Sequence, residues 1–356
     1  MISRGDIRLI YTITLNPSLD YKIYVDGFKE GELNRFRKAN ISSGGKGVNV
    51  SIVLSRLKTP SEAILFVGGF TGQKLIEDVN ADHEVILDPI WIEQDTRINI
   101  KLSTKVETEL NHWGPHVKDE QFEILLKKME HMNENDLVIL GGSAPYGQRD
   151  AFQRIAEMCH KKKIPFIMDT PGQAFPQFID FKPLMMKPNL RELNDYLLME
   201  LVEIKDIIPH ARQLNYRGVK HVIISLGSRG ALYVDETHAY HAKPIEGDAQ
   251  FTTGAGDSMV AGFVHEYLKT DDPISAFKMG VAAASATVFS GRLATPRDIK
   301  KYIKKVNIEE ISDDHSWFDS SRLYPTWFSS TNQDGRHRSN DWHITPASSH
   351  RWYQRI

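Results

Sequence analysis

Short apolar runs recur along the chain and alternate with stretches in which apolar residues return every third or fourth position. An apolar run of about four to eight residues is typical of a buried strand, and the wider spacing is typical of a helix with one buried face. The expected strands lie at 9–15, 63–70, 136–142, 164–170, 184–189 and 221–227. The expected helices lie at 46–57, 118–131, 150–162, 189–199, 205–216 and 256–269. This alternation predicts an α/β fold with a mostly parallel central sheet flanked by helices.

Two segments depart from this alternation. Residues 20–40 and 96–113 place polar and apolar residues in turn and contain turn-forming residues, a pattern typical of short antiparallel strands with one exposed face. A sheet of this size buries little apolar area by itself. We therefore expect a small antiparallel β-sheet that covers a cleft, pairs with a second copy of the chain, or does both.

Composition narrows the range of partners more than the range of folds. The 356 residues carry a formal net charge of -2, with 41% hydrophobic and 25% charged residues, which is ordinary for a globular protein. This balance gives no electrostatic reason to expect nucleic acid or a membrane surface as a partner. An anionic ligand must therefore be bound by local positive groups.

Cysteine content and the N-terminal sequence indicate a soluble, unprocessed cytoplasmic protein. Cys159 is the single cysteine, which excludes an intramolecular disulfide and a cysteine-based zinc site. Asp6 interrupts the apolar core that a signal peptide would need, and no apolar run is long enough to span a bilayer.

Residues 312–356 differ in composition from the rest of the chain. They contain four of the six tryptophans and neither lysine nor glutamate. The spacing of His337, His343 and His350 matches no metal-ligand pattern. We predict a folded domain over 10–311, followed by a partly disordered tail that takes no part in the chemistry.

The stretch TTGAGDSMVAGF at 252–263 places a glycine loop before an apolar helix. It is not the dinucleotide-binding fingerprint, because Met259 stands where that pattern requires its third glycine. The unpaired N–H groups at such a helix start can hold an anion. The loop consists of Gly254, Ala255 and Gly256. Asp257 would lie beside the anion, where it either caps the helix or accepts a proton from a hydroxyl that attacks a bound phosphoryl group.

A second glycine-lined helix start lies at 42–57. It is not a Walker A loop, because Gly47 follows Lys46 where that motif needs serine or threonine. The candidate residues there are Gly44, Gly45, Lys46 and Asn49. Lys46 places a positive charge at the start of the helix. The segment is therefore either a surface turn or a second anion site, such as one for a phosphate on an acceptor.

A third candidate follows the expected strand at 184–189. Pro188 disfavours helical geometry at Lys187, and Asn189 starts a helix in which Glu192 lies at capping-box distance. Asn189 and Glu192 either form a plain capping box or hold water around Mg²⁺, a hard cation that binds few protein ligands directly. Residues 225–231, SLGSRGA, form a further strand-to-turn glycine pair that suits close approach of a nucleotide.

Seven motifs occur together and in the order found in the ribokinase-like (PfkB) carbohydrate kinases, which the chain resembles over roughly residues 10–310. The motifs are TLNPSLD (14–20), GGKGVNV (44–50), VGGFTG (67–72), TRINIK (96–101), KPNLRE (187–192), SLGSRGA (225–231) and TGAGDSMVAGF (253–263). Within this family, TLNP, TRIN and ETELN are most similar to the phosphosugar branch, which includes 1-phosphofructokinases and tagatose-6-phosphate kinases.

The resemblance implies a role for each candidate residue. The catalytic group would comprise Asp257 as general base and the backbone of Gly254, Ala255 and Gly256 as anion hole. The phosphosugar would be bound by Asp20, Gly44, Gly45, Lys46, Asn49 and Arg97. ATP would be bound by Lys187, Ser225, Gly227, Gly230 and Ser285, with residues 283–291 by the adenine. Asn189 and Glu192 would serve Mg²⁺ through water.

The resemblance also implies the fold, the reaction and the assembly. The fold would be ribokinase-like, with the segments 20–40 and 96–113 as a small antiparallel lid through which a homodimer forms. The expected reaction is ATP-dependent phosphorylation of fructose 1-phosphate to fructose 1,6-bisphosphate. The alternatives are a tagatose-6-phosphate kinase and a non-catalytic sugar-phosphate binding protein of the same fold.

The chain departs from the family pattern at several places, including FTTGAGD, which lacks the common Asn and Val upstream of the glycines, and residues 1–9, which precede the usual start. Ala144 replaces a branched apolar residue in GGSAPYG (141–147), and the segment 73–90 is short, which suggests a trimmed helix near the lid. The tail after about 311 matches no family motif.

Overall fold

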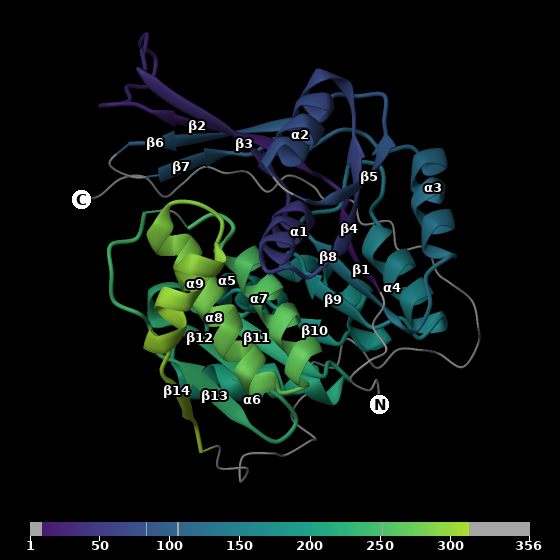
Figure 1. Ribbon diagram of the computed structural model, residues 1–356, viewed down its shortest axis with the longest axis vertical. Coiled ribbons are helices and arrows are strands. Elements are labelled where there is room, and N and C mark those ends of the chain that lie inside the picture. Colours follow the sequence, from purple (N-terminus) through teal and green to yellow (C-terminus); the bar gives the residue numbers. More distant parts are fainter. Residues whose placement is uncertain (1–8, 83, 105–106, 251, 313–356) are drawn as a thin grey trace. The chain divides into compact units, whose positions relative to one another are not determined.

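A ten-stranded sheet forms the central layer of the described part of the chain (Figure 1). The structure is a computed structural model that describes residues 9–312 apart from 83, 105, 106 and 251. The strand order is β14-β13-β12-β11-β10-β9-β8-β1-β4-β5. The strands are β1 (Leu9–Thr14), β4 (Ser61–Val67), β5 (Ile86–Trp91), β8 (Asp136–Gly141), β9 (Phe166–Asp169), β10 (Met185–Met186), β11 (His221–Ser225), β12 (Ala231–Val234), β13 (Ala239–Ala242) and β14 (Ile308–Glu310). Neighbours from β5 to β11 are parallel and those from β11 to β14 are antiparallel, so the predicted mostly parallel sheet is confirmed.

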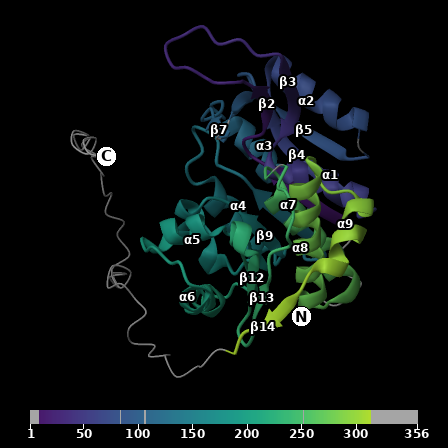
Figure 2. The same cartoon turned by 90° about the vertical axis from the view of Figure 1, so that its left-hand side faces the viewer.

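Helices cover both faces of this sheet (Figure 2). They are α1 (Lys46–Arg56), α2 (Gly69–Asp82), α3 (Asp119–Met129), α4 (Ala151–Lys161), α5 (Leu190–Leu197), α6 (Ile204–Tyr216), α7 (Ala255–Thr270), α8 (Pro273–Ser290) and α9 (Pro296–Tyr302). Short 3₁₀ helices span Gly172–Gln177, Ile179–Phe181, Gly227–Arg229 and Ile303–Lys305. Side chains of α3, α4 and α6 share one apolar cluster with the sheet, and those of α1, α7, α8 and α9 share a second cluster.

Strand β8 illustrates why the buried strands read as continuous apolar runs. Val138 and Leu140 belong to the first cluster, whereas Leu137 and Ile139 belong to the second. Successive side chains of a strand point to opposite faces, and here both faces are covered by helices. Every position from Leu137 to Leu140 is therefore apolar and buried.

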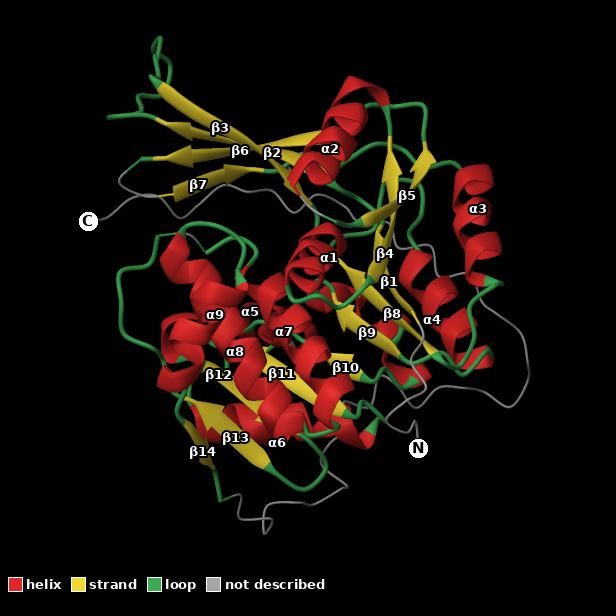
Figure 3. Cartoon of the chain, in the orientation of Figure 1, coloured by secondary structure: helices red, strands yellow, loops and turns green. Residues whose placement is uncertain are grey.

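A second sheet of four strands forms the lid, which Figure 3 shows as a group of arrows apart from the central sheet. It has the order β3-β2-β6-β7, with β2 (Ser18–Tyr24), β3 (Lys38–Gly44), β6 (Arg97–Ser103) and β7 (Glu107–Leu110). The predicted small sheet is confirmed, but it is not antiparallel throughout, because the middle pair β2 and β6 is parallel. A parallel pair needs a long crossover, and the chain between β2 and β6 supplies one through β3, α1, β4, α2 and β5.

Several helices and strands were not predicted correctly from the sequence pattern. Helix α8 has almost no polar face, because it packs against α7 on one side and α9 on the other, so the three-to-four spacing is absent. Strand β10 has two residues in place of the six expected, since prolines flank it at 183 and 188. Helix α2 and strands β5, β12, β13 and β14 were not expected, and α2 extends over 14 residues in the segment that appeared short.

The chain divides into two units at residues 312 and 313. The second unit lies outside the described residues, and with it the prediction for the tail and its histidines. Within the described residues, no helix is both long enough and apolar enough to cross a membrane.

Candidate active site

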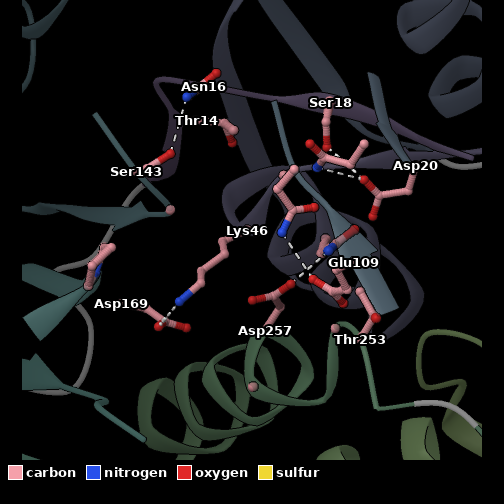
Figure 4. A pocket seen from close by; sticks show the side chains of 18 of the residues that line it. Thr14, Asn16, Ser18, Asp20, Lys46, Glu109, Ser143, Asp169, Thr253 and Asp257 are labelled. Atoms are coloured by element: carbon pink, nitrogen blue, oxygen red, sulfur yellow. Dashed lines mark hydrogen bonds and ion pairs between the residues drawn. The ribbon is translucent and has the colours of Figure 1, made fainter. Parts of the chain in front are cut away.

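A cavity of about 470 Å³ lies at the carboxyl ends of the parallel strands and is bounded by the lid (Figure 4). Its residues include Thr14, Gly142, Asp169, Lys187 and Ser225, which end or follow the neighbouring strands β1, β8, β9, β10 and β11. Ligands of open α/β sheets bind at this edge. From the lid come Ser18, Asp20, Arg97, Asn99, Lys101 and Glu109, and from the two glycine loops Gly45, Lys46, Asn49, Thr253, Gly254, Gly256 and Asp257.

The glycine loop before α7 has the backbone that the sequence requires. Gly254 is the N-cap at φ +78°, where other residues are strained, and α7 begins at Ala255. A Cβ on Gly256 would lie 2.9 Å from the Lys187 ammonium, so the backbone itself faces the cavity there. The first N–H groups of a helix have no partner within it. That of Ala255 is engaged by the Thr252 carbonyl at 3.3 Å, which leaves those of Gly256 and Asp257 as the better anion donors.

Asp257 is a buried carboxylate with a raised pKa. Its side chain lies at the cavity, the residue is 5% exposed, and Asn49 Nδ2 donates a hydrogen bond of 2.7 Å to Oδ2. Burial, together with the negative charge of Asp169, raises the pKa of Asp257 to about 6, against the opposing effects of Lys46 and Asn49. The group therefore ionises within the range in which a general base operates.

Asp169 organises the two lysines of the cavity, and the sequence reasoning missed it. It ends β9 and is 3% exposed; Lys46 Nζ lies 2.6 Å from Oδ1 and Lys187 Nζ 3.3 Å from Oδ2. Although burial opposes its ionisation, Lys187 and Lys46 hold the pKa of Asp169 below its ordinary value. Its position at the carboxyl end of an expected strand was the available signal.

Lys46 faces a group of carboxylates. Besides Asp169, its ammonium lies 3.8 Å from Glu192 Oε1. Burial lowers the pKa of Lys46, but Asp169, Glu192 and Asp257 outweigh burial and raise the pKa above the ordinary value. Lys46 is therefore a permanent positive charge on the side of the cavity that carries the predicted magnesium residues.

Asn189 and Glu192 form the capping box that was one of the two readings of this motif. Asn189 Oδ1 accepts from the Glu192 N–H, and Glu192 Oε2 accepts from the Asn189 N–H, each at 2.8 Å. Burial and Asp169 raise the pKa of Glu192, while Lys46 opposes them. Oε1 takes no part in the cap, so capping leaves one carboxylate oxygen at the cavity, where it fits a cation that keeps part of its water shell.

Polar atoms of the lid converge on the opposite end of the cavity. Asp20 Oδ1 accepts from Ser18 Oγ at 2.8 Å and from Asn99 Nδ2 at 3.1 Å. Arg97 donates to the carbonyls of Asn16 and His112. Among the described residues, Asn16 Oδ1, Arg97 Nε and Asn99 Oδ1 are buried and have no hydrogen-bond partner. Asp20, Arg97 and Asn99 all line the cavity, so this end offers a carboxylate, a guanidinium and an amide to a polyhydroxylated or anionic ligand.

Five of the predicted site residues do not line the cavity: Gly44, Ala255, Gly227, Gly230 and Ser285. A Cβ on Gly230 would lie 2.0 Å from the Ala242 carbonyl oxygen, which explains that glycine by packing of β12 and β13. Ser285 donates to the Val281 carbonyl within α8. The ATP role of Gly227, Gly230 and Ser285 stays a prediction, as do the phosphosugar role of Gly44 and the anion-hole role of Ala255.

The residues that sequence reasoning missed lie beside those that it found. Asn99 and Lys101 follow Arg97 at alternate positions of β6 and share its face. Asn16 and Ser143 lie after β1 and β8 and are joined by a hydrogen bond of 3.1 Å. Applying the period-two rule to TRINIK would have found the two lid residues.

Comparisons with known proteins show the family and the fold of the chain. The sequence profile described as pfkB family carbohydrate kinase matches residues 13–300. A 1-phosphofructokinase of Bacillus subtilis (strain 168) is 36% identical over 306 residues, covering 85% of this chain and 100% of its own length. A D-tagatose-1-phosphate kinase of Bacillus licheniformis is 28% identical over 305 residues, covering 85% and 100%. The crystal structure of phosphofructokinase-2 from Escherichia coli in complex with fructose-6-phosphate has a TM-score of 0.78 at 26% identity, covering 83% of this chain and 98% of that one.

Proposed function

The chain belongs to the PfkB family of carbohydrate kinases, phosphotransferases that act on a sugar hydroxyl, and from this premise we propose that it phosphorylates fructose 1-phosphate with ATP. The products are fructose 1,6-bisphosphate and ADP. The observation that carries the proposal is the Asp257 carboxylate, buried at a glycine-lined helix start and facing a cavity that also holds Lys46. The similarity to 1-phosphofructokinases supports the choice of acceptor.

Asp257 acts as the general base in this proposal. The O6 hydroxyl attacks the γ-phosphorus, its proton passes to Asp257, and the bond to the bridging oxygen of ADP breaks. A loose transition state needs little proton removal before the new bond forms, so a carboxylate is basic enough. A positioned base contributes about 10²–10⁴-fold.

Positive charge and backbone N–H groups stabilise the transferring phosphoryl group. The N–H groups of Gly256 and Asp257 supply an anion hole at the positive end of the α7 dipole. The contacts of Lys46 with Asp169 and Glu192 put its ammonium on this side, so we assign it to the transferring phosphoryl rather than to the phosphate of the acceptor. Mg²⁺, held through water by Glu192 Oε1 and Asn189, would neutralise further phosphate charge.

The acceptor lies with its phosphate away from the lid carboxylates. Asp20 and Glu109 repel an anion, whereas Arg97, Asn16 and Ser143 offer a guanidinium, an amide and a hydroxyl, and Asn16 donates a hydrogen bond to Ser143. Sugar hydroxyls then meet Asp20 and Asn99, which both line the cavity. Fructose and tagatose phosphates share the phosphate and differ at one hydroxyl, so a tagatose phosphate is the second candidate, favoured by the relative that acts on D-tagatose 1-phosphate.

A coupled ADP-release assay tests the acceptor. We expect kcat/KM for fructose 1-phosphate to exceed that for fructose at least about 100-fold, because a site built for a phosphate leaves buried polar groups unpaired when it is absent. Tagatose 6-phosphate, tagatose 1-phosphate and fructose 6-phosphate complete the panel. Equal or faster turnover of unphosphorylated fructose would contradict the proposal, and a preference for a tagatose phosphate would replace the acceptor but keep the chemistry.

We further propose that the lid forms a homodimer through its outer face. Ile41, Tyr21, Ile100 and Leu110 lie opposite one another across β3, β2, β6 and β7. Because side chains alternate along a strand, this apolar row faces away from Asp20. Ile41 is 53% and Leu110 54% exposed, and an exposed apolar sheet face of this kind marks an association surface.

Sedimentation velocity tests the dimer. The wild-type chain of 40.6 kDa should sediment as two copies, and Ile41→Asp should shift it to one, because a carboxylate would be buried in the apolar interface. Leu198→Asp is the control, since Leu198 is 92% exposed on the α5 side of the molecule. A monomeric wild-type chain, or dissociation by Leu198→Asp and not by Ile41→Asp, would show that this face is not the interface.

A further inference from the structure

Lys101 joins the lid to the loop that carries the anion hole. It lies on β6, its side chain is 7% exposed, and its ammonium is 3.1 Å from Asp20 Oδ2 and 3.6 Å from Glu109 Oε1. The same ammonium donates a hydrogen bond of 3.1 Å to Thr253 Oγ1. Asp20 and Glu109 belong to the lid, whereas Thr253 directly precedes the N-cap Gly254.

The contact with Thr253 acts at a sensitive position of the backbone. Gly254 is a glycine at positive φ, so the chain has little resistance to rotation there, and the N–H groups of Gly256 and Asp257 follow within one turn. Transition-state stabilisation depends on donors placed to within fractions of an ångström. A side chain anchored in the lid therefore fixes one end of the loop on which the anion hole depends.

Asp20 provides the link to the acceptor. Its Oδ1 already accepts from Ser18 and Asn99, and its Oδ2 is the partner of Lys101. An acceptor hydroxyl bound at Asp20 would thus be one contact away from Lys101 and two from Thr253. The chain of contacts runs from the acceptor end of the cavity to the catalytic loop through a single buried ammonium.

We propose that Lys101 and Thr253 form a latch that positions the anion hole against the lid, so that Lys101 is a positioning residue for phosphoryl transfer. The inference rests on the proposed kinase function and adds to it a coupling between the acceptor end and the α7 helix start. Loss of the latch lowers the rate of transfer from the ternary complex. It leaves the binding of ATP unchanged, because the three partners of Lys101, which are Asp20, Glu109 and Thr253, are not among the residues predicted to bind the nucleotide.

Thr253→Val tests the latch with the smallest change, since it replaces one hydroxyl by a methyl group and keeps the Lys101 charge. We expect kcat about tenfold lower, from the loss of a hydrogen bond to a charged group, with KM for ATP within about twofold of wild type. Thr253→Ser should restore kcat to within about twofold, because it returns the hydroxyl. In a double-mutant cycle, Lys101→Met and Thr253→Val should be less than additive in kcat.

Hydrogen exchange of the amides of residues 252–258 provides a readout that does not need activity. Exchange there should rise in Thr253→Val and Lys101→Met and stay at the wild-type rate in Thr253→Ser and in the control Thr270→Val, which alters the far end of α7. If the wild-type chain transfers phosphate to no sugar phosphate, the kinase function fails and exchange alone decides the latch. Wild-type exchange in Thr253→Val, wild-type kcat in that variant of an active enzyme, or equal loss in Thr253→Val and Thr253→Ser would overturn it.

Discussion

Asp257→Asn is expected to lower kcat at least about 100-fold, which is the smaller end of what a positioned general base contributes. Asparagine has nearly the same shape and keeps the start of α7, but its amide cannot accept the proton of the attacking hydroxyl. KM for ATP should change little, because the carboxylate repels rather than binds the phosphates. Steady-state kinetics with the preferred acceptor measures both quantities.

Asp271→Asn is the matched control for this variant. Asp271 is the C-cap of the same helix and has φ +56°, a left-handed conformation that asparagine also adopts. It lies at the opposite end of α7 from the cavity, so the same chemical change should leave kcat at the wild-type value. Turnover of Asp257→Asn near that of wild type would exclude Asp257 as the base.

The acceptor kcat/KM is expected to fall about tenfold for each pH unit below an apparent pKa of about 6. The sign follows from the role of Asp257: a base acts only when ionised, and burial beside Asp169 raises the pKa of this carboxyl, so protonation removes activity as the pH falls through 6. From about one pH unit above this pKa the carboxylate is almost fully formed, and the profile is flat on this side. A pH profile of kcat/KM between 4.5 and 8, with about half-unit steps, measures the acid limb.

Asn49→Leu separates Asp257 from the other carboxyl groups of the cavity. Glu192 also has a raised pKa, whereas Asp169 has a lowered one and stays ionised between pH 4.5 and 8. The acid limb of the profile alone therefore does not show whether Asp257 or Glu192 is the group that titrates. Asn49 donates to Asp257 and favours its charged form. Removing this donor should raise the pKa of Asp257 and so move the acid limb to higher pH, even if the maximum of kcat/KM also changes. An unmoved limb would assign it to another carboxyl group.

Much of the site was predictable because its parts are local in sequence. A glycine loop before an apolar helix specifies both positive φ and a set of free N–H groups, so Gly254 and Asp257 could be recognised from 252–263 alone. Asn189 and Glu192 are three residues apart, and their capping box follows from that spacing. The alternation of buried strands with helices predicted the parallel sheet for the same reason, since the faces of each element are set by its own period.

The missed elements and residues depend on what packs against them. Helix α8 lacks a polar face because α7 and α9 cover it. The sequence of residues 273–290 does not show that these helices pack there. The parallel pairing of β2 with β6 depends on the long crossover between them. In the sequence, Lys101 is only one polar residue of an alternating strand. Its contacts with Asp20 and Thr253 exist only in the folded chain.

The sequence pattern predicted six of the parallel strands, the glycine loops that begin helices, and the acid at the start of α7, because backbone geometry and periodicity act over a few residues. The partners of those groups depend on how distant segments pack in the folded chain. Asn49 meets Asp257 across 208 positions because α1 packs against α7, and Lys46 meets Asp169 across 123 because α1 begins beside the carboxyl end of β9. The charges that raise the pKa of Asp257 and fix Lys46 are therefore a property of this packing, which no single motif contains.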